Sequence, residues 1–211
     1  MSADGKLVAK SAQRIGDDAR IDYAPAHPYV SRGALKLVAA LDHFGISPAG
    51  LVCLDIGAST GGFTEVLLER GAAKVYAVDV GHGQLHAKIA RDRRVVSCEG
   101  VNARDLDIPE RPALIVVDVS FISLRLALPA TLARATSGTQ LVALVKPQFE
   151  VGRARVGKGG LVKSPEDRRG ALEAIETWLS RDAGWSVTAA IESPIEGGDG
   201  NREFLLAAKK P

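Results

Sequence analysis

The chain has 211 residues, of which 46% are hydrophobic and 25% charged, and its formal net charge at pH 7 is +2. This length suits one domain with a small addition, and the composition excludes an intrinsically disordered chain. The sequence offers no membrane span and no signal peptide, and two cysteines, Cys53 and Cys98, are too few for a disulfide framework. We therefore expect a cytoplasmic protein that has no membrane partner.

The first 26 residues differ from the rest of the chain. Short alternating runs at 6–8 and 20–23 predict two small strands, and the prolines between 25 and 28 predict a linker. A segment of this size is too small to bury a core of its own. We expect it to dock on another unit or to belong to a larger domain, and we place the start of the main domain at residue 27.

The main domain is expected to begin with a helix from Ser31, a good N-cap, to Gly45, where glycine favours termination. Five apolar runs follow and predict strands that are buried on both faces; they span 51–56, 74–79, 94–98, 113–119 and 140–145. Helical patterns alternate with these strands, as in the βαβ units of a parallel sheet; they span 62–70, 84–91, 123–135 and 166–183.

Two further strands, 185–191 and 203–208, are expected to close the chain. The glycine-rich loop between them is too short for a crossover helix, so the last strand should run antiparallel to its neighbour. The predicted fold class is therefore α/β, with a seven-stranded and mostly parallel sheet whose last strand is antiparallel.

The turn after the first of these strands carries the pattern D-x-G-x-x-x-G-G, which begins at Asp55. Glycines here allow a sharp turn and a close approach of the backbone to a ligand. Ser59 stands where the dinucleotide fingerprint needs its second glycine, and no Lys-Ser or Lys-Thr pair completes a P-loop. A carboxylate before the first glycine suits a ligand with amines or positive charge, such as S-adenosylmethionine. The candidate contacts are Asp55, Gly57, Ala58, Ser59 and Gly61.

Polar residues also stand at the ends of the following strands. Asp79 is placed to accept hydrogen bonds from both ribose hydroxyls, and Asn102 to hold the adenine amino group. Asp118 ends the fourth strand. Open parallel sheets bind ligands at the carboxyl ends of their strands, so these positions together predict a methyltransferase-type cofactor site that also includes Val80 and Ala103. A glycine-rich turn alone would be equally consistent with a tight connection.

Four charged residues are candidates for the chemistry: Lys36 in the first helix, Asp118 and Lys146 at strand ends, and Glu203 at the start of the last strand. Each alone is most simply a surface charge. Together they suit methyl transfer to a ribose 2′-hydroxyl, because a lysine amine can take the hydroxyl proton where a second cation lowers its pKa and a carboxylate orients it. The histidines and cysteines lack metal-ligand spacing, so we predict no metal site.

Positive charge is concentrated between residues 151 and 169, where six lysines and arginines against two acidic residues leave a local charge of +4. Four glycines space this segment, which predicts a mobile loop able to follow a phosphate backbone. We expect Arg153, Arg155, Lys158 and Lys163, together with Arg32, to contact RNA. The alternative is a solvated surface loop.

Seven segments resemble the TlyA, or hemolysin A, family of FtsJ-like methyltransferases; they are residues 29–37, 54–64, 78–85, 102–106, 118–124, 144–150 and 200–205. The resemblance covers residues 27–211 in order and implies the Rossmann-like class I methyltransferase fold. It also implies 2′-O-methylation of cytidine in ribosomal RNA, with S-adenosylmethionine as the cofactor. The Lys-Asp-Lys-Glu tetrad of the family falls on Lys36, Asp118, Lys146 and Glu203.

The resemblance also bears on the partners and on the N-terminal segment. It makes ribosomal RNA or a ribosomal subunit the expected partner, with residues 150–163 facing the RNA. Members usually begin with an S4-type RNA-binding domain, and residues 1–26 resemble the C-terminal remnant of such a domain followed by a linker.

Three alternatives stay open on the sequence alone. The basic segment disfavours a methyltransferase of the same fold that acts on a small molecule, and the complete tetrad disfavours an inactive RNA-binding module. A membrane-lytic hemolysin, which the family name suggests, is disfavoured because the sequence has no membrane span, signal peptide or evident membrane-surface helix.

Overall fold

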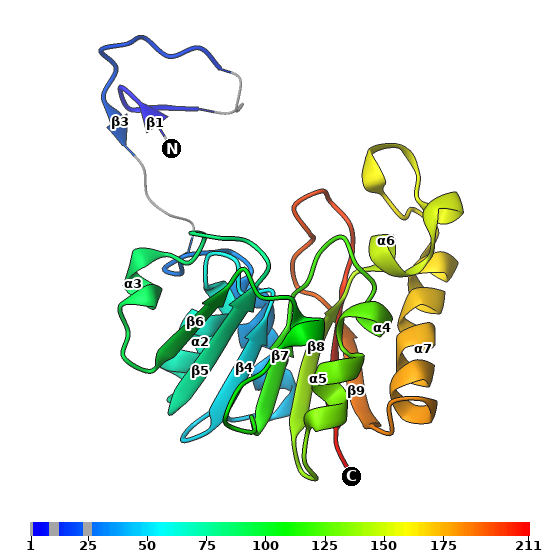
Figure 1. Cartoon of the computed structure of the whole chain (residues 1–211). Helices are drawn as coiled ribbons and strands as arrows, with labels where there is room; N and C mark the ends of the chain where they lie inside the picture. Colours follow the sequence, from blue (N-terminus) through cyan, green and yellow to red (C-terminus); the bar gives the residue numbers. More distant parts are fainter. Residues whose placement is uncertain (1, 9–12, 23–26) are drawn as a thin grey trace.

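A computed structural model of the chain describes residues 2–8, 13–22 and 27–211 (Figure 1). Near the N-terminus, β1 (Ser2–Ala3), β2 (Lys6–Leu7) and β3 (Ile21–Asp22) form a small antiparallel sheet in the order β2-β1-β3. Strands were predicted at 6–8 and 20–23 but not at β1, which pairs with both. The chain reverses between β1 and β2 at Asp4 and Gly5, which both have positive φ. Position 23 and the proline at 25 lie outside the described residues.

The large sheet has seven strands in the order β6-β5-β4-β7-β8-β10-β9. Five of them pair in parallel: β4 (Val52–Ile56), β5 (Lys74–Asp79), β6 (Val95–Glu99), β7 (Leu114–Val117) and β8 (Gln140–Val145). The last strand, β10 (Phe204–Lys209), lies antiparallel between β8 and β9 (Ser186–Glu192). The structure thus confirms the predicted α/β sheet with its antiparallel last strand.

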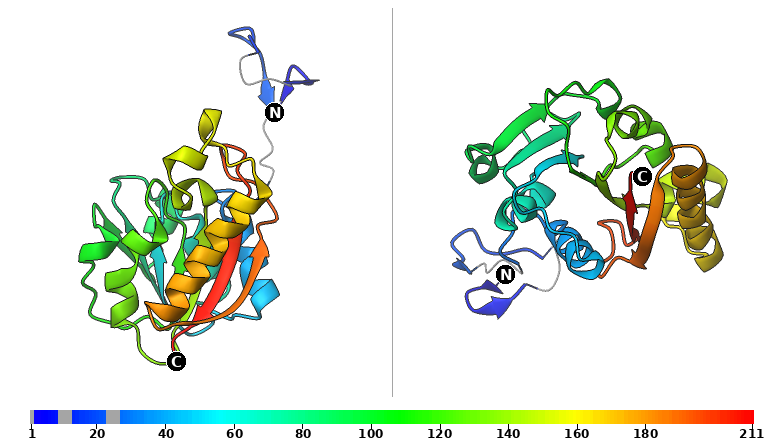
Figure 2. Two further views of the ribbon diagram at one scale, coloured as in Figure 1. Left: turned by 90° about the vertical axis from the view of Figure 1, so that its right-hand side faces the viewer. Right: turned by 90° about the horizontal axis from the view of Figure 1, so that it is seen from below.

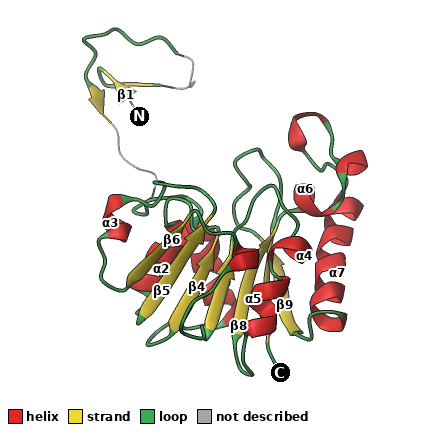
Figure 3. Ribbon diagram, in the orientation of Figure 1, coloured by secondary structure: helices red, strands yellow, loops and turns green. Residues whose placement is uncertain are grey.

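Helices cover both faces of this sheet (Figures 1, 2 and 3). One face carries α1 (Ala34–Phe44), α2 (Gly62–Glu69) and α3 (Ala87–Ala90), and the other α4 (Leu124–Ala127), α5 (Pro129–Arg134) and α7 (Pro165–Arg181). The remaining single turns follow strand ends: η1 (Ala103–Asp105), α6 (Pro147–Glu150), η2 (Arg153–Arg155) and η3 (Lys158–Gly160). None of the helices in the described ranges is long and apolar enough to cross a membrane.

Alternation along the strands divides the core into two layers. In β4, the side chain of Cys53 packs with α1 and α2, whereas Leu54 and Ile56 pack with α4, α5 and α7. Successive side chains of a strand point to opposite faces, so Asp55 shares the face of Cys53. Cys98, on β6, is half-buried against the core layer that contains α4, α5 and α7.

The first helix of the main domain begins three residues later than predicted. Ser31 closes a turn before the helix, where its Oγ accepts a hydrogen bond from Gly33 N at 3.2 Å, and α1 starts at Ala34. The predicted end is correct, because Gly45 caps the helix in the left-handed conformation.

Three other predicted elements need correction. The helix expected over 123–135 is two helices, because Pro129 lacks the N–H needed to continue α4 and instead starts α5. The helix expected over 84–91 shrinks to α3, because Glu99 Oε1 accepts from the N–H groups of Gln84 and Leu85. The strand predicted over 94–98 is not buried on both faces: β6 lies at the edge of the sheet and pairs only with β5.

Candidate active site

The carboxyl ends of the parallel strands line a cavity of about 550 Å³. Its wall includes seven of the predicted cofactor residues: Gly57, Ser59, Asp79, Val80, Asn102, Ala103 and Asp118. A cavity of a few hundred cubic ångströms suits a ligand of the size of a nucleoside derivative. It lies where an open α/β sheet places its ligand.

A smaller cavity of about 170 Å³ adjoins the first. The two share the wall formed by Gly57, Ser59, Asp118 and Ser120. Lys146 and Ala58 line only the smaller one. The predicted cofactor site and one predicted catalytic lysine therefore stand on two sides of a common wall.

The loop after β4 depends on glycine at two positions. Gly57 has φ +84°, and a Cβ there would lie 2.5 Å from the carbonyl oxygen of Asp118. Gly61 has φ +95°, and a Cβ there would lie 2.9 Å from Leu85. At Gly57 a side chain is therefore excluded by contact with backbone atoms as well as by backbone conformation. At Gly61 the backbone conformation disfavours a side chain, and Leu85 and Ile89 would have to shift to admit one. Between them, Ser59 also adopts a positive φ of 48°, which brings its N–H to Asp79.

Asp79 fixes this loop as well as lining the cavity. Its Oδ2 accepts from Ser59 N and its Oδ1 from Gly81 N, both at 2.8 Å. Asn102 is more constrained than the sequence suggested, because its Oδ1 accepts from Arg104 N at 3.0 Å and Arg104 Nε at 3.2 Å. The amide oxygen that was expected to meet the adenine amino group is therefore already engaged.

Asp55 lies beneath the loop and does not line either cavity. Its side chain is fully buried, and its Oδ2 accepts from Thr64 Oγ1 at 2.6 Å, while its Oδ1 has no donor within the described part of the chain. Burial raises the pKa of Asp55 to about 7, and the charges of Asp118 and Asp79 add to the effect. Three carboxyl groups thus crowd around one loop.

The four predicted catalytic residues form two ion pairs. Lys146 Nζ lies 2.6 Å from Asp118 Oδ1 and donates a hydrogen bond to Ser120 Oγ at 2.8 Å. Lys36 Nζ donates to Glu203 Oε2 at 2.5 Å, and both of these side chains are buried.

The sheet explains why the two pairs meet. In the antiparallel β8–β10 pair, Phe204 stands opposite Val145, so Glu203 and Lys146 leave the sheet side by side. Burial raises the pKa of Glu203, while the charges of Lys36 and Lys146 lower it and that of Asp118 raises it. All four charges therefore act on one another.

The loop between β9 and β10, residues 193–203, packs closely around Glu203. Gly197 lies so close that a Cβ there would be 2.7 Å from Glu203 Oε1. Asn201, which is 2% exposed, accepts from Val162 N at 2.9 Å and donates to Gly160 O at 2.9 Å and to Asp199 Oδ2 at 3.0 Å. Its amide thereby ties the segment before α7 to the loop that ends at Glu203.

The residues predicted to contact RNA are all exposed. Arg153, Arg155, Lys158 and Lys163 follow α6, at the same edge of the sheet as the tetrad. The segment contains the single turns η2 and η3 rather than a plain loop. Arg32 stands beside the loop over Glu203, where its Nη2 donates to the carbonyl oxygen of Glu196 at 3.1 Å.

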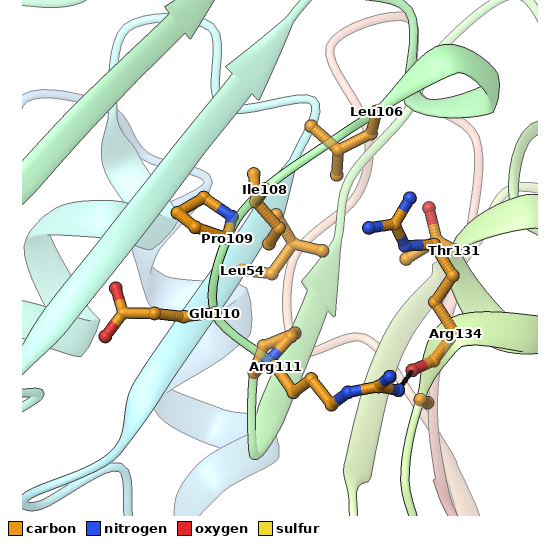
Figure 4. Close-up of a pocket in the computed structure, with 10 residues that line it drawn as sticks. Leu54, Leu106, Ile108, Pro109, Glu110, Arg111, Thr131 and Arg134 are labelled. Atoms are coloured by element: carbon orange, nitrogen blue, oxygen red, sulfur yellow. Dashed lines mark hydrogen bonds between the residues drawn. The ribbon is translucent and has the colours of Figure 1, made fainter.

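A third cavity of about 130 Å³ lies on the α5 side of the sheet, near the loop that precedes β7 (Figure 4). Its floor is apolar and includes Leu54, and Arg111 Nη1 donates to Arg134 O at its rim. None of the predicted site residues lines it. Among the described residues, no group of three or more His, Cys, Asp or Glu side chains is arranged to hold a metal ion.

Several residues that line the site were not identified as site residues from the sequence. Ser120 and Phe121 line the larger cavity after Asp118, and Gln84 lines it from the far side. Phe121 is 91% exposed and has φ +66°. A serine or glutamine in a loop carries no signal of its own, whereas an aromatic residue three positions after a strand-end carboxylate was a usable signal.

Comparison with known proteins agrees with this geometry. The FtsJ-like methyltransferase family matches residues 29–210. A curated relative from Mycobacterium tuberculosis, the 16S/23S rRNA (cytidine-2′-O)-methyltransferase TlyA, is 46% identical over 96% of this chain and 77% of its own length. Hemolysin A of Brachyspira hyodysenteriae is 44% identical over 96% of this chain and 85% of its own length.

Solved structures point the same way. A protein from Lactococcus lactis that was provisionally named a hemolysin superposes with a TM-score of 0.83 at 45% identity, over 87% of this chain and 89% of its own. An S-adenosylmethionine-dependent methyltransferase from Mesorhizobium loti gives a TM-score of 0.55 at 14% identity, over 82% of this chain and 96% of its own, which shows the shared fold alone. The chain therefore belongs to the TlyA (hemolysin A) family of FtsJ-like methyltransferases.

Proposed function

We propose that this protein is a cytoplasmic S-adenosylmethionine-dependent methyltransferase that methylates the ribose 2′-hydroxyl of cytidine in ribosomal RNA, either free or within a ribosomal subunit. The observation that carries the proposal is the paired tetrad, Lys36–Glu203 and Lys146–Asp118, beside a nucleoside-sized cavity. The names of the relatives support the substrate class. We further propose that residues 1–26 belong to an S4-like RNA-binding domain and the linker that follows it.

The residues of the larger cavity fit S-adenosylmethionine. Asp79 and Asp118 place carboxylates on the wall of this cavity, which suits the sulfonium and ammonium groups of this ligand. Asp79 lies at the end of β5, where acidic residues bind ribose hydroxyls. Gly57, which lines the cavity, lets the loop turn close to the backbone of Asp118. When bound, S-adenosylmethionine supplies an electrophilic methyl group.

The tetrad supplies the proton transfer. A neutral Lys146 amine takes the proton of the 2′-hydroxyl, and Asp118, 2.6 Å away, stabilises the ammonium that forms. Ser120 Oγ orients the same amine by its hydrogen bond. Lys36, held by Glu203, supplies a second cation that stabilises the developing negative charge on the oxygen. The remaining rate acceleration comes from alignment of the hydroxyl with the methyl group.

Labelled methyl transfer from S-adenosylmethionine to ribosomal RNA, free and in subunits, tests the proposal. We expect incorporation at a cytidine ribose. Lys146→Ala is expected to lower kcat by at least about 100-fold, in the range of lost general-base catalysis, with the cofactor Kd nearly unchanged by calorimetry. Asp79→Ala is expected to raise the cofactor Kd instead.

Two results would contradict these assignments. A wild-type protein that is inactive on every ribosomal substrate would refute the function. Equal losses of cofactor affinity in the Lys146→Ala and Asp79→Ala variants would refute the division of roles between the two residues.

A further inference from the structure

Two strand-end segments carry half of the tetrad. Residues 118–124 follow β7 and contain Asp118, and residues 146–150 follow β8 and contain Lys146. The two strands are parallel neighbours in the sheet, so both segments emerge at the same edge. We call this pair of segments the loop clamp.

The segments of the loop clamp touch at three successive places. At the inner end, Lys146 Nζ lies 2.6 Å from Asp118 Oδ1 and donates a hydrogen bond to Ser120 Oγ at 2.8 Å. The rings of Phe121 and Phe149 contact each other in the middle in a tilted arrangement, with centroids 5.4 Å apart. The outer contact is made by Glu150, which does not belong to the tetrad.

Glu150 joins the segments with both of its carboxylate oxygens. Its Oε2 accepts from Ser123 Oγ at 2.6 Å, and its Oε1 accepts from Leu124 N at 2.9 Å. Burial raises the pKa of Glu150, whereas these two hydrogen bonds and the charge of Arg125 lower it. Removing a carboxylate from water costs free energy unless hydrogen bonds compensate it. The two hydrogen bonds to Ser123 and Leu124 provide that compensation here.

The segment that Glu150 holds is strained. Phe121 has φ +66° although it is not a glycine, and such a conformation persists only where its surroundings fix it. Lys146 fixes the segment on one side of Phe121 and Glu150 on the other. Glu150 lines none of the three cavities described above, so it acts through the residues it holds.

We propose that Glu150 is a positioning residue for methyl transfer, which closes the loop clamp and thereby sets Asp118 against Lys146. The kinetic test of this inference rests on the proposed function. A second test, by hydrogen exchange, is independent of catalysis. Glu150 lines neither of the two adjoining cavities, so its loss should slow the chemical step more than it weakens binding of cofactor or RNA.

Glu150→Ala should lower kcat about 10- to 100-fold, since a misplacement of about 1 Å can cost that much. The KM values for cofactor and RNA should change by less. Glu150→Gln, which keeps the size but offers one acceptor oxygen, should retain more activity than Glu150→Ala. Formate should restore part of the kcat of Glu150→Ala by filling the vacated carboxylate position. Glu173→Ala, at an exposed position on α7, is the matched control and should behave as wild type.

Hydrogen exchange measured by mass spectrometry provides a test without catalysis. In Glu150→Ala, residues 118–124 and 146–150 should both exchange faster, while α1 and β10 stay protected as in the wild type. If the alanine variant fails to fold, Glu150→Gln and Ser123→Ala carry the same comparison with smaller expected effects.

The inference is overturned if folded Glu150→Ala keeps its kcat within twofold of wild type, or if formate has no effect on it. It is also overturned if only residues 146–150 exchange faster. A wild-type protein without methyltransferase activity would refute the proposed function, and the exchange experiment would then decide the role of Glu150 by itself.

Discussion

Asp55 shows how far a motif predicts the role of a single residue. Its spacing before Gly57 predicted a ligand contact, yet the side chain is buried against Thr64 and faces away from both cavities. The cause is the alternation of β4, which turns Asp55 to the α2 side together with Cys53. Asp118 and Lys146 follow the last residues of their strands, so alternation does not turn them away, and both line the smaller cavity.

We expect Asp55 to make the stability of the protein depend on pH. Its pKa is about 7 in the folded protein and about 4 in an unfolded chain. Between these values the folded state holds a proton that the unfolded state has released, so the free energy of unfolding falls as the pH rises. The slope should reach about 1.4 kcal/mol per pH unit.

Asp55→Asn keeps an acceptor for Thr64 and should remove this part of the slope in urea unfolding between about pH 4 and 7. Asp182→Asn, at an exposed position, serves as the control. Identical slopes for wild type and Asp55→Asn would contradict the shifted pKa.

At the scale of elements, strand order and strand ends could be read from the sequence better than helix ends and side-chain partners. Apolar runs bounded by polar residues predict strands by themselves, whereas the break at Pro129 and the short α3 depend on local hydrogen bonds. The Lys36–Glu203 pair depends on α1 packing against β10, across 167 positions of sequence. No local pattern contains that contact. The sequence analysis grouped the two residues as candidates for the chemistry, but it did not predict the ion pair between them.

Asn201 offers a test of how two loops are joined. Asn201→Ala leaves the N–H of Val162 buried without its acceptor. The expected loss is about 1–3 kcal/mol in the free energy of unfolding, with faster hydrogen exchange in residues 157–163. Asp199→Ala removes only the bond at 3.0 Å to an exposed carboxylate and should cost less. Equal losses in the two variants would contradict a joining role for Asn201.

Across the whole molecule, chemistry and positive charge share one edge of the sheet. Asp118, Lys146, the two adjoining cavities and the basic segment lie beyond the carboxyl ends of parallel strands. Glu203 ends the loop into β10, and Lys36 reaches it from α1. The sequence predicted the segment from its charge alone, because lysines and arginines spaced by glycines need no tertiary contact to stay exposed. Its two single turns, η2 and η3, were not predictable from that composition.

We expect the basic segment to dominate the salt dependence of RNA binding. Replacing Arg153, Arg155, Lys158 and Lys163 with alanine should reduce the slope of log K against log salt by about 0.7 for each lost contact with single-stranded RNA. Fluorescence anisotropy over a range of salt concentrations measures this slope. Replacement of Arg111 and Arg181, which are exposed at the opposite end of the strands, should leave it unchanged. Parallel slopes for all three proteins would exclude the segment from the interface.

The wall shared by the two cavities has a consequence for inhibitor design. Gly57, Ser59, Asp118 and Ser120 face both spaces, so a single compound can carry a nucleoside group into one cavity and a ribose mimic into the other. Joining two weakly bound fragments converts the second binding event into an intramolecular one and raises its effective concentration. Because a side chain at Gly57 would clash with the backbone of Asp118, resistance by a bulkier residue at that position of the shared wall would also disrupt the loop on which the enzyme depends.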